Sequence, residues 1–167
     1  MAISTSAASS SAASNSAVST GLQRIGVGGF DAADPDTWSR VRKAFAGALA
    51  LSEGEVELDH TIIGDLGAES LDFLDIAFRL ERAFDIKIPR GGIESTAKSD
   101  LGDEPYEIGG VLTPKALASL REAMPEVPAE EVVEGLKVTE VAGLFRVATF
   151  YNLVVHLLGQ KARGELA

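Results

Sequence analysis

The fold of this chain depends above all on residues 65–89, DLGAESLDFLDIAFRLERAFDIKIP. From Ser70 onward apolar residues recur every three or four positions, which predicts an amphipathic helix that begins at this serine. The apolar residues form two rows: Phe73, Ala77, Leu80 and Phe84 in one, and Leu71, Leu74 and Phe78 in the next. We expect this apolar side to face the interior. We also expect Pro89 to end the segment, with Ile88 extended before it.

Two roles for Ser70 are compatible with its place at the start of the predicted helix. A serine there commonly accepts a hydrogen bond from an unpaired backbone N–H group and so acts as the N-cap. An exposed serine can also be a covalent attachment point, and a phosphodiester on it would lie against the positive end of the helix dipole. The residue pattern by itself leaves both roles open.

The segment resembles the prosthetic-group segment of acyl carrier proteins, in which an LG-x-[DE]-S-L loop leads into the second helix. The likeness covers the loop LGAESL (66–71), the helix after it and the ending Ile-Lys-Ile-Pro. It implies that Ser70 carries a covalent 4'-phosphopantetheine arm, donated by coenzyme A through a phosphopantetheinyl transferase. Glu69 stands where the family usually has Asp, and we expect this to alter transferase recognition only in degree. Within the family, SLDFLDIAF (70–78) most resembles carriers of very long or unusual acyl chains.

The resemblance also implies a fold and a set of site residues. We expect an all-α fold, an acyl-carrier-like four-helix bundle with an inserted loop-plus-helix segment before the last helices. An acyl chain would be shielded between the helices, and the candidates for lining its cleft are Phe73, Leu74, Ala77, Phe78, Phe150 and Val154. Three acids around the attachment point are predicted to recognise partner enzymes with basic docking patches: Glu69, Asp72 and Asp75.

Composition narrows the range of functions. The net charge of −10 argues against nucleic acid as a partner and favours partners with basic patches. The chain has no cysteine, and because His60 and His156 lack ligand-like spacing we expect no metal site. No apolar run approaches the ~20 residues of a membrane span, and there is no secretory signal pattern. We expect a cytoplasmic monomer.

The resemblance implies a carrier. The sequence also predicts that the chain is not an enzyme, because no base stands beside Ser70 and no catalytic triad can be assembled. The predicted function is to hold acyl chains as thioesters and to present them to lipid-biosynthesis enzymes, namely acyl-chain synthases and acyltransferases. One alternative is a carrier of amino acid or polyketide intermediates. Another is an unmodified regulatory or scaffolding module of the same fold. A hydrolase that uses Ser70 is the least favoured.

Three regions are predicted from composition along the chain. Residues 1–30 comprise a Ser/Ala-rich tail and a Gly-rich linker, which we expect to be disordered. Residues 31–160 form the carrier domain, whose first helix begins near Asp34 and ends around Leu51. Residues 161–167 are expected to be frayed.

Residues 90–135 form an insertion that is too long for an ordinary connector. Its first part, residues 90–107, is predicted to be a loop, and a helix follows from Lys115 to Met124 with Thr113 as its cap. Residues 129–134 are expected to form one short helical turn.

The last elements of the bundle follow the insertion. A helix that opens at Val138 is the candidate for the third helix of the family's bundle. The final helix is predicted over Phe150–Leu158, with Thr149 as its cap and Gly159 closing it.

We expect the insertion to act as a wall beside the acyl cleft. Its apolar side chains would pack beside the central helix, and its Gly91-Gly92 and Gly109-Gly110 pairs would serve as hinges. The residues that would form this wall are Val111, Leu112, Leu117, Leu120, Met124 and Val127. Three alternatives stay open: side chains that simply dock on the bundle, a docking surface for one dedicated enzyme, and a surface with no role.

Overall fold

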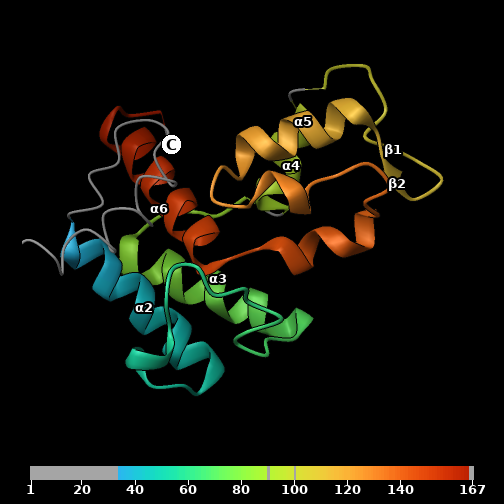
Figure 1. The fold of residues 1–167 in the computed structure, drawn as a ribbon. Helices are drawn as coiled ribbons and strands as arrows, with labels where there is room; N and C mark the ends of the chain where they lie inside the picture. The colour runs from blue at the N-terminus through green and yellow to red at the C-terminus, as the bar shows by residue number, and fades with distance from the viewer. Residues whose placement is uncertain (1–33, 90, 100, 166–167) are drawn as a thin grey trace, which may run out of the picture.

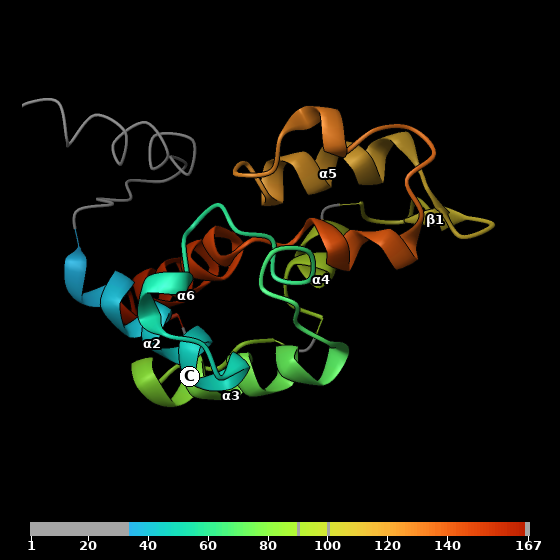
Figure 2. The ribbon, with the colours of Figure 1, turned by 60° about the horizontal axis from the view of Figure 1, so that its bottom comes forward.

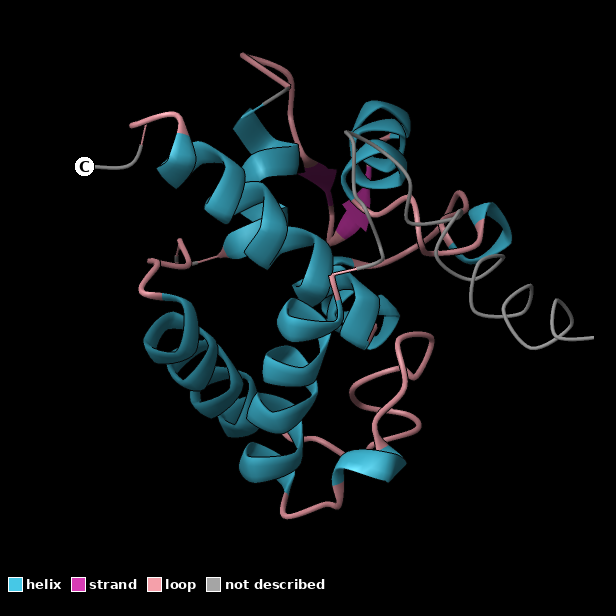
Figure 3. Ribbon diagram, turned by 90° about the vertical axis from the view of Figure 1, so that its left-hand side faces the viewer, coloured by secondary structure: helices cyan, strands magenta, loops and turns pink. Residues whose placement is uncertain are grey.

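The computed structural model describes residues 34–89, 91–99 and 101–165, so the predicted tail and linker (1–30) lie outside the described residues. Its elements in chain order are α2 (Pro35–Leu49), η1 (Glu53–Glu55), α3 (Ser70–Phe84), α4 (Gly92–Ser99), β1 (Glu107–Ile108), β2 (Val111–Leu112), α5 (Pro114–Ala123), η2 (Ala129–Glu131), η3 (Val138–Leu144) and α6 (Val147–Ala162). Figure 3 shows that helices and loops make up these segments, apart from the small β1–β2 hairpin. The predicted helical fold is confirmed, with this hairpin as an addition.

Helix α2 begins where the sequence predicts. The Asp34 carboxylate accepts a hydrogen bond from the Asp36 backbone N–H (3.2 Å) and a second from the Thr37 hydroxyl, while Pro35 occupies the first turn. The helix ends at Leu49, slightly before the predicted end, because Ala50 adopts a left-handed conformation with φ of 55°. The Asp34 carboxylate at the start and the Ala50 N–H at the end thus pair with backbone groups that the helix would otherwise leave unpaired.

Helix α3 buries one of its two apolar rows and exposes the other. Ile76, Leu80 and Phe84 are buried in the core. The second row lies on the outside, with exposed fractions of 77% for Leu71, 68% for Leu74 and 55% for Phe78. The expectation that this row faces the interior is wrong, because Ile76 extends the buried stripe on the other flank of Leu80.

The end of α3 also differs from the prediction. The helix stops at Phe84, because Asp85 takes the left-handed conformation (φ 51°) and its N–H bonds to the Glu81 carbonyl. Lys161 on α6 donates to both the Asp85 carbonyl (2.7 Å) and its carboxylate (2.6 Å), which ties this corner to the last helix. Pro89 therefore follows a non-helical stretch and does not itself end the helix.

The bundle is built from α2, α3 and α6. In Figure 1, α2 and α3 lie side by side and α6 lies above them. The three helices and the link 50–69 share one core of buried residues: Val41, Ala44, Phe45, Ala46, Val56, Ile62, Ala68, Ile76, Leu80, Phe84, Ile86, Val147, Phe150, Tyr151, Val154 and Leu157. The candidate third helix, η3, is a 3₁₀ helix placed just before α6.

Helix α6 is longer than predicted at both ends. Arg146 is its N-cap, and Thr149 lies in the first turn, where its hydroxyl accepts a hydrogen bond from the Arg146 N–H (3.0 Å). The helix continues through Gly159 to Ala162. The predicted start at Phe150, the cap at Thr149 and the closure at Gly159 are wrong.

Backbone hydrogen bonds fasten the link between α2 and α3 to the start of α6. The Ala148 N–H donates to the Leu58 carbonyl (2.8 Å), and the Val147 N–H donates to the His60 carbonyl (3.0 Å). In the opposite direction, the Ile62 N–H donates to the Phe145 carbonyl (2.9 Å). The chain that leads to Ser70 is thus held from two sides.

The insertion has a core of its own. Figure 2 shows α4, α5, η2 and η3 grouped to one side of the α2–α3 pair. Helix α4 occupies part of the segment predicted as a loop, and it packs against α5. The buried residues of this second core are Ala97, Leu101, Tyr106, Leu112, Ala116, Leu117, Leu120, Met124, Val127, Val132 and Val141.

The second core corrects the expected wall. The predicted wall residues Leu112, Leu117, Leu120, Met124 and Val127 are all buried among one another, and not beside α3. Gly109 and Gly110 both have positive φ and form the two-residue turn of the β1–β2 hairpin, where glycine is favoured. The pair thus forms the turn of the hairpin, and its role as a hinge stays a prediction.

Polar contacts clamp the insertion to α6. Glu126 accepts hydrogen bonds from the Thr149 hydroxyl (2.5 Å) and from the Asn152 side-chain amide (3.1 Å). Glu131 pairs with Arg146 at 2.9 Å, and the Arg146 side chain is only 13% exposed. Because a partly buried arginine left without its partner is costly, this pair holds the two parts in one register.

Truncation of one residue in each row of α3 tests the observed orientation. We expect Ile76→Ala to lower the free energy of unfolding by about 2–5 kcal/mol, because it removes a fully buried side chain and leaves a cavity. Leu71→Ala should change it by less than about 0.5 kcal/mol, because that side chain is largely exposed. Urea denaturation of both variants measures the difference, and equal losses would mean that the helix is rotated.

Candidate attachment site at the start of α3

Ser70 is the first residue of α3, and its side chain is exposed. The N-cap is Glu69, whose backbone N–H donates to the Asp72 carboxylate at 2.7 Å. The interpretation of Ser70 as the N-cap is therefore wrong. The described residues offer the Ser70 hydroxyl no hydrogen-bond partner, so its oxygen faces solvent and is accessible to a partner enzyme.

The loop before Ser70 is folded tightly. The Asp65 carboxylate accepts hydrogen bonds from the Thr61 N–H and hydroxyl, both at 2.8 Å, and these bonds lower the pKa of Asp65. The buried Ala68 donates its N–H to the Ile62 carbonyl (3.0 Å), and Gly67 takes a positive φ of 70° that suits glycine. Ser70 is consequently presented by an anchored turn.

The geometry at Ser70 fits a phosphodiester. Helix α3 runs for 15 residues from this serine, so the partial positive charge of its first turn lies beside the hydroxyl. An anionic group on the Ser70 oxygen would extend from there toward solvent, without displacing a packed side chain. The residues present therefore suit a covalently attached phosphate arm.

The three acids predicted for partner recognition have different environments. The Asp72 carboxylate is occupied by the Glu69 N–H, so it also holds the helix start. Asp75 forms an exposed ion pair with Arg79, with 3.0 Å between the Oδ2 and Nε atoms. Glu69 is exposed at the cap. The negative face is thus partly neutralised within the helix itself.

The structure brings together three of the six predicted cleft residues, Phe73, Phe150 and Val154, in the bundle core. The rings of Phe73 and Phe150 lie with their centroids 6.1 Å apart, and Val154 is buried one turn further along α6. Ala77 is half-buried on the same side of α3 as Phe73. Leu74 and Phe78 are exposed on the outer side, so the structure does not join them to this group.

Sequence reasoning missed Phe145, which completes an aromatic cluster with Phe73 and Phe150. Its ring lies 6.3 Å from Phe73 and 6.4 Å from Phe150, measured between centroids. Phe145 immediately precedes the N-cap of α6, and Phe150 is the fourth residue of the helix. Apolar residues at these two positions commonly pack as a hydrophobic staple, and this spacing would have identified the pair.

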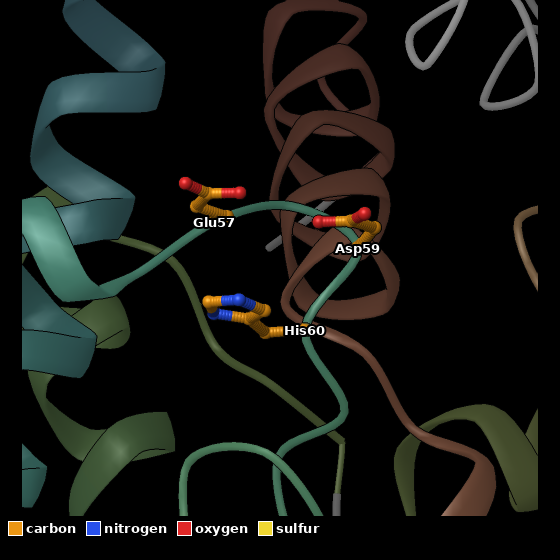
Figure 4. Close-up of side chains that lie close together, drawn as sticks. All are labelled: Glu57, Asp59 and His60. Atoms are coloured by element: carbon orange, nitrogen blue, oxygen red, sulfur yellow. The ribbon is translucent and has the colours of Figure 1, made fainter.

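A group of potential metal ligands lies in the link between α2 and α3. The ligand atoms of Glu57, Asp59 and His60 are within 4.8 Å of one another, as Figure 4 shows for their side chains. Both acids are exposed, and such groups commonly carry no ion, so we assign no metal site.

No helix in the described part of the chain is long and apolar enough to cross a membrane.

Comparisons with known proteins identify the family. A family model described as the phosphopantetheine attachment site matches residues 39–93. The acyl carrier protein of Campylobacter lari is 38% identical over 58 residues, which cover 35% of this chain and 75% of that relative. No solved structure matches the chain. The helical bundle and the matched attachment segment define a small carrier protein, and the chain belongs to the acyl carrier protein family.

Family membership establishes the general function. The protein is a carrier and not an enzyme, and its cofactor is 4'-phosphopantetheine, attached covalently. A phosphopantetheinyl transferase and synthase partners are implied in general terms by the carrier domain.

Substitution of two acids separates helix capping from charge. We expect Asp72→Ala to lower the free energy of unfolding by about 1 kcal/mol, because the Glu69 N–H loses its acceptor. Asp75→Ala should cost about 0.5 kcal/mol or less, because it removes only an exposed ion pair. Chemical denaturation measures both values. A loss for Asp75→Ala as large as that for Asp72→Ala would contradict the capping role.

Proposed function

We propose that Ser70 is the attachment residue, and that the protein holds acyl chains there as thioesters and presents them to lipid-biosynthesis enzymes. The observation that carries this proposal is the exposed Ser70 at the first position of α3, inside the segment matched by the attachment-site family model. The attached group supplies a thiol on a flexible arm, which this cysteine-free chain lacks. The protein contributes the anchoring oxygen and the anchored turn that presents it.

We propose further that the bundle shields the acyl chain between α3 and α6, beside Phe73, Phe150 and Val154. Phe73 lies one turn after Ser70 and contacts the Phe150 ring, which supports an entry point close to the attachment residue. Each methylene that is buried contributes about 0.8 kcal/mol, so a long chain is retained strongly while partner enzymes compete for it.

Very long or unusual acyl chains are the proposed cargo. The support is the likeness of residues 70–78 to specialised carriers, together with a second apolar core that an ordinary connector lacks. The partners proposed for such cargo are acyl-chain synthases and acyltransferases with basic docking patches, which suit a chain of net charge −10.

The outer face of α3 is the proposed recognition surface for these partners. Beside Ser70 it presents the exposed Leu71, Leu74 and Phe78, bordered by Glu69 and by the Asp75–Arg79 pair. Exposed apolar side chains rimmed by charge are typical of interaction sites. We therefore propose a partner surface that is apolar at its centre and basic at its edge.

The same proposal includes the organisation of the chain. The carrier domain covers residues 31–160 and contains the insertion 90–135, whose apolar core also takes in Val141 of η3. We propose that the protein acts as a monomer.

Replacement of Ser70 tests the attachment. With coenzyme A and a broad-specificity transferase, the protein should gain one phosphopantetheinyl group, as measured by intact mass. Ser70→Ala should gain none and should remain folded, because Ser70 is exposed, its hydroxyl forms no hydrogen bond with another described residue, and surface substitutions change stability by less than about 0.5 kcal/mol.

A matched control for this experiment is Ser52→Ala, which alters an exposed serine at the N-cap of η1. That variant should be modified like the unchanged protein. Equal modification of Ser70→Ala would refute the assignment of the attachment residue.

Substitutions on the outer face of α3 test partner recognition. We expect the double change Leu74→Ala and Phe78→Ala to slow modification or acyl loading about tenfold, which corresponds to about 1.4 kcal/mol of lost contact. The effect should persist at high salt, whereas the slower rate expected for Glu69→Lys with Asp75→Lys should shrink as salt screens the charges. Initial rates at low and high salt measure both. Unchanged rates for the apolar double variant would exclude this surface.

A further inference from the structure

The two apolar cores of the molecule meet at a single side chain. Phe145 packs against the bundle core and also against the insertion core. No other apolar residue in the described ranges packs against both of them from outside. Its ring is therefore the apolar boundary between two interiors that are otherwise separate.

This boundary lies close to the start of α3. Phe73 is one turn beyond Ser70, and the rings of Phe73, Phe145 and Phe150 are in mutual contact with centroids 6.1–6.4 Å apart. A chain that leaves Ser70 and passes Phe73 toward the interior would meet the Phe145 ring next. The same ring packs against the insertion core, which includes Val141.

The backbone of Phe145 is anchored by hydrogen bonds. Its carbonyl accepts a hydrogen bond from the Ile62 N–H (2.9 Å), and its own N–H donates to the Ala142 carbonyl (3.3 Å). The adjacent Arg146 is paired with Glu131 of the insertion. Since packed interiors resist overfilling by even a methylene or two, a bulky ring packed against Phe73 and Phe150 on this anchored backbone limits how far an acyl chain can extend.

We propose that Phe145 determines the longest acyl chain that the protein can shield, because its ring is the apolar group that packs against both the bundle core and the insertion core. This inference rests on the proposed attachment at Ser70 and deepens it with a specificity-determining residue. A smaller side chain at position 145 would open space that is continuous with the insertion core, and a longer chain would occupy it.

The test uses the full chain, modified at Ser70 and loaded with straight saturated acyl groups of increasing length. The melting temperature of each acylated form is compared with that of the same variant carrying only the arm. In the unchanged protein the melting temperature should rise with the length of the acyl chain and then level off at a certain length. In Phe145→Ala it should level off roughly three to four carbons later, because the lost ring has about the volume of that many methylenes.

Two further variants complete the test: a milder substitution at position 145 and a control substitution elsewhere in the bundle core. Phe145→Leu removes less volume and should shift the limit by roughly one or two carbons, so it serves if the alanine variant does not fold. Phe84→Leu creates a similar space at the other end of α3, where Phe84 is buried in the bundle core, and should leave the limit unchanged.

A second readout avoids reliance on melting alone. The acyl thioester should react more slowly with hydroxylamine when its chain is shielded, and in Phe145→Ala this protection should extend to the longer chains.

The outcomes are distinguishable. If both Phe145 variants level off at the same length as the unchanged protein, the inference is wrong and the proposed function stands. If intact mass shows no arm or acyl group on the unchanged protein, the proposed function fails and this inference fails with it.

Discussion

Burial of one apolar stripe of α3 determines which side chains of this helix are exposed to solvent. Ile76, Leu80 and Phe84 pack into the core with α2 and α6, and this sets the rotation of the helix about its axis. Because a helix is rigid, the same rotation turns Leu71, Leu74 and Phe78 outward and places Ser70 at an exposed end. The attachment turn and the proposed docking surface are thus consequences of one packing choice.

The insertion is a second constraint of a different kind. Its apolar side chains stabilise one another and so do not compete with α2 or α3 for the bundle core. What joins it to the bundle is mostly polar: Glu126 to Thr149 and Asn152, and Glu131 to Arg146. Such contacts define direction more sharply than apolar packing does, so the insertion is oriented relative to α6 as well as attached to it.

Local signals made much of the fold predictable. The cap and proline at Asp34-Pro35, the cap at Thr113 and the stripe of α5 all act within a few residues, and each is found where the sequence predicts it. The exposed row of α3 was not predictable in this way. Leu71, Leu74 and Phe78 have the spacing of a buried face, and only the positions of α2 and α6 determine which flank of Leu80 is covered.

The site shows the same division. Ser70 was predicted as the attachment residue from the motif around it, but its relation to Glu69 and Asp72 depends on where the helix starts, and helix ends are the least certain part of a sequence prediction. The role proposed for Phe145 depends on contact between segments distant in sequence. Helix α4 was missed because Gly91, Gly92 and mixed charges favour a loop, whereas packing against α5 stabilises a helix there.

The clamp between the insertion and α6 has a consequence for how the chain folds. The insertion stands between α3 and α6, two elements that must meet to close the bundle, and closing so long a loop costs conformational entropy. If the segment folds first, its two ends are already close together. Most of the conformational entropy of loop closure is then lost before α6 docks. Early folding of the α4–α5 unit would then speed formation of the bundle core, because it would place α6 close to α2 and α3.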